Sequence, residues 1–182
     1  MSLLALKSLI PNKKQKPAVQ DGMVLDRSRL DALKTFTKLL KIPMGDGQIL
    51  NEALTHKSYT HERKMRAGYH NEKLEFLGDS VLGLVISEHV FKSYPEVTEG
   101  GLSKVKSVVV SANVLSEKAK KINLSPYLLL GKGEEKSGGR HRPALLADAL
   151  EAVIGAIYLE GGLAPARRFV LGMLAEDVDN VF

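Results

Sequence analysis

The chain has 182 residues, enough for one well-packed domain, and no cysteine, which excludes disulfide bonds and thiolate metal sites. Its formal net charge is +5 at pH 7, but four of the 26 basic residues fall in the first 17, and the remaining 22 nearly balance the 21 acids. Bulk charge is therefore weak evidence for a nucleic-acid partner, and no uncharged run of about 18 residues indicates a membrane span.

The N-terminal part differs in composition from the rest of the chain. Residues 1–22 are interpreted as a basic, flexible extension, because Pro11 and Pro17 bracket the run NKKQK. Residues 23–182 are interpreted as one folded domain. No signal-peptide pattern is present, and the absence of cysteine suits a protein inside the cell, so a cytoplasmic location is expected.

Apolar spacing predicts helices along nearly all of the folded domain. They are expected at about residues 30–40, 49–54, 70–94, 101–122 with a break near Ser111, 144–159, and from Pro165 onward. The run LGKGEEKSGGRHRP, residues 130–143, is expected to be a loop. Val108–Val110 is the only strand-like run and is too short to build a sheet. The prediction is an all-α, multi-helix fold.

The helix expected over residues 70–94 carries three acids on one face. At about 100° per residue, Glu72, Glu75 and Asp79 fall roughly opposite the apolar face. That apolar face contains Leu74, Leu77, Val81, Leu84 and Val85. The ordinary explanation is the solvated side of an amphipathic helix. The alternative is a cation site, because three aligned acids repel one another.

The run ALLADALEAVIGAIYL, residues 144–159, is apolar on all sides except at Asp148 and Glu151. A helix that is apolar all round is normally buried, and a buried carboxylate needs a compensating partner. The sequence leaves three kinds of partner open: an arginine such as Arg140 or Arg142, a pair of backbone amides, or a divalent cation.

Packing of these two helices against each other would bring together Glu75, Asp79, Asp148 and Glu151. A set of oxygen ligands selects Mg²⁺ or Mn²⁺, and zinc is not expected because the histidines are not spaced as a helical pair. Carboxylate-bound Mg²⁺ suits phosphodiester hydrolysis. No small-molecule cofactor is expected, because Glu135 stands where a nucleotide-binding P-loop requires glycine before Lys136-Ser137.

Five blocks resemble the ribonuclease III family, in that family's order, over about residues 30–182. They are THKSY (55–59), HNEKLEFLGDSVL (70–82), EGGLSKVKS (99–107), LGKGEE (130–135) and LADALEAVIGAIYLEGG (146–162). The resemblance implies an all-helical, homodimeric endonuclease domain that binds double-stranded RNA between its subunits and acts in the processing of rRNA and other RNA. It also implies one Mg²⁺-dependent cut in each strand, with Mn²⁺ as a substitute, leaving 5′-phosphate and 3′-hydroxyl ends.

The resemblance also assigns roles to residues. The family's metal-binding, catalytic acids fall on Glu75, Asp79, Asp148 and Glu151. Two further acidic positions of its cleft fall on Glu72 and Glu99, which are expected to support the metal ligands or to bind metal themselves. Phe76 matches an aromatic residue of the subunit interface, with an ordinary core position as the alternative. Candidate RNA contacts, each of which has an ordinary solvated side chain as its alternative, are Lys57, Lys104, Lys106, Lys132 and Arg140.

Small residues of the same motif, namely Gly78, Ser80 and Gly83, are compatible with close packing against a second subunit. The family's double-stranded-RNA-binding domain is not expected in this sequence, since only 22 residues follow Glu160. The sequence is expected to be either a truncated chain or a member that works without that domain. The motif FLGDS and the basic extension resemble full-length bacterial members and favour truncation. A non-catalytic RNA-binding member of the fold is the functional alternative, but such members usually lack one of the four acids.

Overall fold

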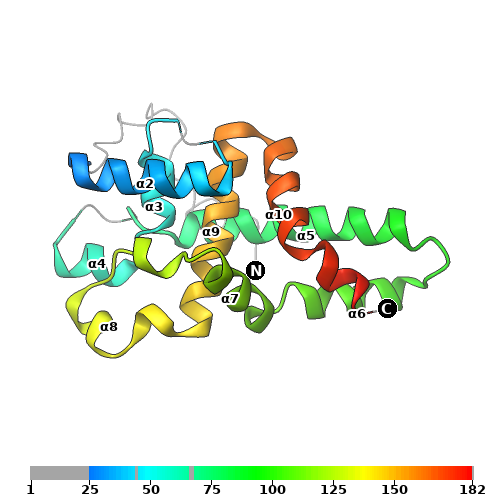
Figure 1. The fold of residues 1–182 in the computed structure, drawn as a ribbon. Helices are drawn as coiled ribbons and strands as arrows, with labels where there is room; N and C mark the ends of the chain where they lie inside the picture. Colours follow the sequence, from blue (N-terminus) through cyan, green and yellow to red (C-terminus); the bar gives the residue numbers. More distant parts are fainter. Residues whose placement is uncertain (1–24, 44, 66–67, 182) are drawn as a thin grey trace, which may run out of the picture.

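The structure is a computed structural model that describes residues 25–43, 45–65 and 68–181 (Figure 1). The expected extension, residues 1–22, lies outside them. The helices are α2 (Arg27–Leu40), α3 (Gln48–Ala53), α4 (Lys57–Glu62), α5 (Glu72–Ser93), α6 (Glu99–Val109), α7 (Ala112–Lys121), α8 (Lys132–Lys136), α9 (Pro143–Gly161) and α10 (Leu163–Asp179). The described residues contain no β-strand beyond one isolated bridge between Thr55 and Leu129, so the all-α prediction is confirmed. None of the described helices combines the length and the apolar character that crossing a bilayer requires.

Helix α9 is the centre of the core. It packs against α3, α5, α7 and α10, and 11 of its residues are buried. Figure 1 shows α9 (orange) crossing α5 near the start of that helix. The buried helix predicted from the continuous apolar run is therefore confirmed. Its two acids, Asp148 and Glu151, are half-buried rather than exposed.

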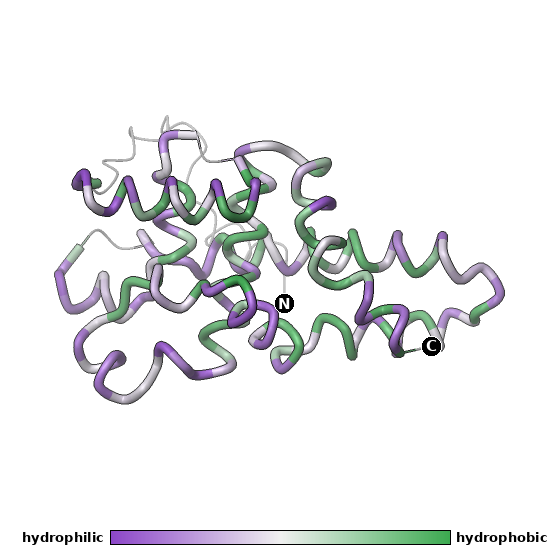
Figure 2. The backbone as a smooth tube through the Cα atoms, in the orientation of Figure 1, coloured by the Kyte–Doolittle hydropathy of each residue, from purple (hydrophilic) through white to green (hydrophobic). Residues whose placement is uncertain are grey.

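The second half of α5 and the antiparallel α6 extend away from this core as an arm (Figure 1). Figure 2 shows hydrophobic residues along both helices of the arm. Helix α10 covers one side of it. The placement of Leu84 on the buried face was wrong, because its side chain is 54% exposed. Among the described residues, nothing buries the side of α5 on which Leu84 lies.

Two element boundaries differ from the sequence-based expectation. The break at Ser111 is confirmed, but Gly100 and Gly101 lie inside the first turn of α6, because the Thr98 hydroxyl caps that helix. Pro165 is the third residue of α10 and does not begin it.

The prediction of a loop over residues 130–143 is wrong. It contains α8 and a 3-10 turn over Gly139–His141. Two features order the segment. The Gly131 backbone N–H donates to Ser58 Oγ at 2.9 Å, and Glu135 and Glu134 form ion pairs with Arg140 and Arg142 respectively.

Candidate metal centre

The two acid-bearing helices meet at a pair of glycines. A Cβ atom on Gly78 of α5 would lie 1.7 Å from the carbonyl oxygen of Glu151, and one on Gly155 of α9 would lie 2.3 Å from that of Leu74. Only glycine permits backbones to approach this closely. The expectation that Gly78 packs against another subunit is therefore wrong, since it packs against α9 of its own chain. This contact sets the acids of the two helices side by side.

Three of the predicted acids converge at this crossing. One carboxylate oxygen from each of Glu75, Asp148 and Glu151 lies within 4.8 Å of the other two, and all three residues are half-buried. Opposite oxygen ligands of a hard divalent cation lie roughly 4–5 Å apart, so the spacing fits Mg²⁺ or Mn²⁺ with small adjustments. We call these three residues the acidic cluster. Asp79 is exposed at its rim.

The acids of the cluster destabilise one another's charged forms. Burial raises the pKa of Glu151 from its ordinary value of 4.5 to about 7, and repulsion from Asp79, Asp148 and Glu75 adds to the rise. Burial is also the main cause of the raised pKa of Asp148, and burial followed by repulsion from Asp148 raises that of Glu75. A bound cation would relieve both the burial cost and the repulsion.

No arginine among the described residues forms an ion pair with these acids. Among residues 25–43, 45–65 and 68–181, neither Asp148 nor Glu151 forms an ion pair or accepts a hydrogen bond at its side chain. The proposed partners Arg140 and Arg142 bind Glu135 and Glu134 instead. Two of the three kinds of partner that the sequence left open are thus absent from the described residues, and the donor set that remains fits a divalent cation.

The two additional acids lie in different places. Glu72 is exposed beside the cluster, where its carboxylate lies 3.0 Å from Lys57 Nζ and 3.6 Å from His70 Nδ1. Glu99 begins α6 at the far end of the arm and accepts a hydrogen bond from Ser103. Within one chain the structure does not bring Glu99 to the acidic cluster.

The predicted RNA contacts are also dispersed. Lys57 and Lys132 are exposed on α4 and α8, while Lys104 and Lys106 lie on the arm. Arg140 points inward, because its guanidinium donates to Glu135 and to the carbonyl oxygen of Ser125. Its side chain is already occupied within the chain.

The sequence-based prediction of site residues did not include His56. His56 is half-buried at the N-terminus of α4, where its Nδ1 accepts from the Ser58 backbone N–H, and burial lowers its pKa. Its charge acts on Asp148 and opposes the rise of that pKa. The signal was its place in the THKSY block, directly before Lys57.

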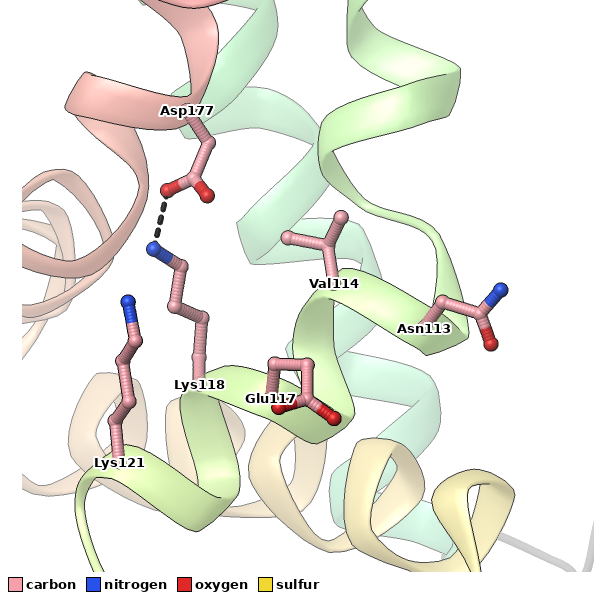
Figure 3. Close-up of a pocket in the computed structure, with 6 residues that line it drawn as sticks. All are labelled: Asn113, Val114, Glu117, Lys118, Lys121 and Asp177. Carbon is pink, nitrogen blue, oxygen red and sulfur yellow. Dashed lines mark ion pairs between the residues drawn. The ribbon is translucent and has the colours of Figure 1, made fainter.

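Two surface pockets lie apart from these acids. One of about 270 Å³ lies between α7 and α10 and is closed on one side by the ion pair of Lys118 with Asp177 (Figure 3). The other, about 530 Å³, is lined by α2 residues together with Tyr59, Arg63 and Leu129. Neither pocket includes an acid of the cluster.

The raised pKa of Glu151 predicts how stability depends on pH in metal-free buffer. A carboxyl whose folded-state pKa is raised contributes stability below its unfolded pKa and loses it as pH rises through the folded value, here from about 4.5 to about 7. Because the side chain is half-buried and screened by solvent, we expect a loss of about 1–2 kcal/mol. Urea unfolding at several pH values should show this loss, and Glu151→Gln should make it smaller, leaving the contributions of Asp148 and Glu75. An identical pH slope in both proteins would contradict the assignment.

Comparison with known proteins identifies the fold family. The sequence profile described as Ribonuclease-III-like matches residues 46–178. Ribonuclease 3 of Borreliella burgdorferi is 47% identical over 149 residues, which cover 82% of this chain and 60% of the relative. Ribonuclease 3 of Heliobacterium modesticaldum is 50% identical over 145 residues, covering 80% and 62%. The chain thus spans about 60% of the length of these curated relatives.

A solved structure agrees with the sequence comparison. The nuclease domain of ribonuclease III from Campylobacter jejuni superposes with a TM-score of 0.73 at 38% identity. The match covers 79% of this chain and 96% of that domain. The acids of α5 and α9 lie within the matched sequence profile. The chain therefore belongs to the ribonuclease III family.

Proposed function

We propose that this chain is an endoribonuclease that hydrolyses double-stranded RNA at the acidic cluster, with Mg²⁺ as its cofactor and Mn²⁺ as a substitute. The observation that carries the proposal is the convergence of three half-buried, unpaired carboxylates from α5 and α9 in a member of this family. The relatives' name, Ribonuclease 3, supports RNA as the substrate. The products would carry 5′-phosphate and 3′-hydroxyl ends, and the role would lie in the processing of rRNA and other RNA.

The acids are proposed to have different roles according to their positions. Glu75, Asp148 and Glu151 would hold the cation, which in this class of reaction lowers the pKa of a bound water and neutralises charge on the phosphate. Asp79, exposed at the rim, offers an acceptor that can orient the attacking water. Exposed lysines of α6 and α8 would contact the RNA backbone.

We also propose that the chain acts as a homodimer. Phe76, Leu84 and Phe91 of α5 are 77%, 54% and 70% exposed and fall within about 80° of arc on the helix. Val108 of α6 adds a further exposed apolar side chain. Single surface residues of this kind are ordinary, but an aligned apolar stripe indicates an interface. The Campylobacter nuclease domain is described as having a region involved in dimer formation, which supports the proposal.

Phe76→Asp is expected to convert the dimer to a monomer at micromolar concentration, because a buried carboxylate at the interface centre has no partner. Sedimentation velocity measures the change. Leu39→Asp on α2 is the matched control, since Leu39 is equally apolar and 63% exposed but lies off this stripe. A monomeric unchanged protein, or a dimeric Phe76→Asp variant, would contradict the dimer.

The experiment that tests the function is cleavage of a perfect RNA duplex with and without Mg²⁺, beside a single strand of the same sequence. We expect cutting of the duplex in Mg²⁺ or Mn²⁺ and none after chelation. Duplex binding without cutting in either metal would favour a non-catalytic RNA-binding protein instead.

A further inference from the structure

Lys57 lies beside the acidic cluster and is already engaged with an acid. It is the first residue of α4, and its Nζ lies 3.0 Å from one oxygen of Glu72. The other oxygen of Glu72 lies 3.6 Å from Nδ1 of His70, whose side chain is 15% exposed. Of these two neighbours, Lys57 is the permanently charged one, and it forms the ion pair with Glu72 at the rim of the cluster.

The charge of Lys57 also reaches the cluster itself. It opposes the rise in the pKa of Glu75 and in that of Asp148. Lys57 is the lysine whose charge is among the main ones acting on both of these acids. Glu151, which no such cation reaches, has the pKa that is raised to about 7.

The backbone around Lys57 is fixed to the segment that leads into α9. The His56 backbone N–H donates to the Leu129 carbonyl oxygen at 3.0 Å, and Ser58 Oγ accepts from the Gly131 backbone N–H at 2.9 Å. A Cβ atom on Gly131 would lie 2.6 Å from the Ser58 carbonyl oxygen, so the two segments touch. The start of α4 therefore keeps its place relative to Asp148.

We propose that Lys57 is a positioning residue of the acidic cluster: its ammonium group holds the Glu72 carboxylate at the rim and offsets repulsion among the acids before a divalent cation binds. The consequence for cleavage rests on the proposed function. A fixed positive charge this close repels an incoming cation, so its removal should tighten metal binding. The same removal frees Glu72, which should slow the reaction. Removal of a lysine that only contacts RNA phosphates would change neither the metal affinity nor the rate of the chemical step.

The test compares Lys57→Met with Lys38→Met, which removes the same charge from an exposed position on α2. Thermal unfolding at pH 8 is measured during titration with Mn²⁺ alone. For Lys57→Met we expect a lower metal-free melting temperature and a midpoint Mn²⁺ concentration about three- to fivefold lower, from the loss of one unit charge near the site. Lys57→Arg should restore the midpoint, and Lys38→Met should leave it unchanged.

Duplex cleavage separates the positioning role from an RNA contact. We expect Lys57→Met to lower kcat about tenfold with little change in KM, an effect typical of groups that orient metal ligands. In a Glu72→Gln background the same replacement should have little further effect on kcat, because Lys57 acts through Glu72. A raised KM with unchanged kcat and midpoint would identify a phosphate contact and overturn the proposal.

The metal titration needs no RNA. If the unchanged protein cuts no duplex, the proposed function fails, whereas the Mn²⁺ midpoint still tests the electrostatic role of Lys57. An unchanged midpoint in Lys57→Met overturns the positioning proposal even when cleavage by the unchanged protein is normal.

Discussion

Glu151→Gln is expected to lower the rate of duplex cleavage by about a thousandfold, a loss comparable to the removal of one essential charge-stabilising group. Glutamine keeps the volume of the side chain but removes one of three charged ligands from the cluster. Asp148→Asn should behave in the same way. Duplex binding should persist, because contacts to RNA phosphates depend on lysines outside the cluster. Single-turnover kinetics measure the loss of cleavage, and a gel-shift assay without metal measures the retained duplex binding.

A stability measurement distinguishes misfolding of Glu151→Gln from loss of its catalytic activity. Glu151→Gln is expected to be as stable as the unchanged protein or more so in metal-free buffer at pH 8, since it removes an uncompensated charge. Glu176→Gln is the matched control, because Glu176 is exposed on α10. Normal cleavage by Glu151→Gln would show that the acidic cluster is not the catalytic centre.

Gly78→Ala is expected to reduce the free energy of unfolding by about 3–5 kcal/mol, among the largest effects of a single substitution. The added Cβ would lie 1.7 Å from the oxygen and 2.6 Å from the carbon of the Glu151 carbonyl group. Both are backbone atoms, so no flexible side chain can move aside. The helices must separate, and the acids of α5 and α9 must separate with them. Urea unfolding measures the loss, and cleavage should fall with it.

Gly172→Ala on α10 is the control for this prediction. A Cβ there meets nothing within 4 Å, so alanine should raise stability by about 0.5–1 kcal/mol through its helix propensity. If Gly78→Ala were as stable as Gly172→Ala, the close contact of α5 with α9 would be wrong.

The sequence predicted the helical class, the buried α9 and the acids of both helices because these follow from local periodicity. A continuous apolar run with two acids requires burial and compensation wherever it lies in the fold. The convergence of Glu75 with Asp148 and Glu151 was a hypothesis about packing, and the geometry of the described residues agrees with it.

The remaining features depend on contacts between distant segments. Leu84 matches the apolar period of α5, but none of the helices that the structure describes covers that side of the arm. Gly78 showed that something packs closely, yet its spacing cannot distinguish a helix of the same chain from a second subunit. Arg140 was free to pair with several acids, and its proximity to Glu135 decided the outcome.

The most direct test of the account is a crystal of this protein soaked in Mn²⁺ and measured at a wavelength where manganese scatters anomalously. We predict a peak within about 2.5 Å of carboxylate oxygens of Glu75, Asp148 and Glu151, which disappears in Asp148→Asn. Occupied manganese sites elsewhere and none among these three acids, in a protein that still cuts duplex RNA, would contradict it.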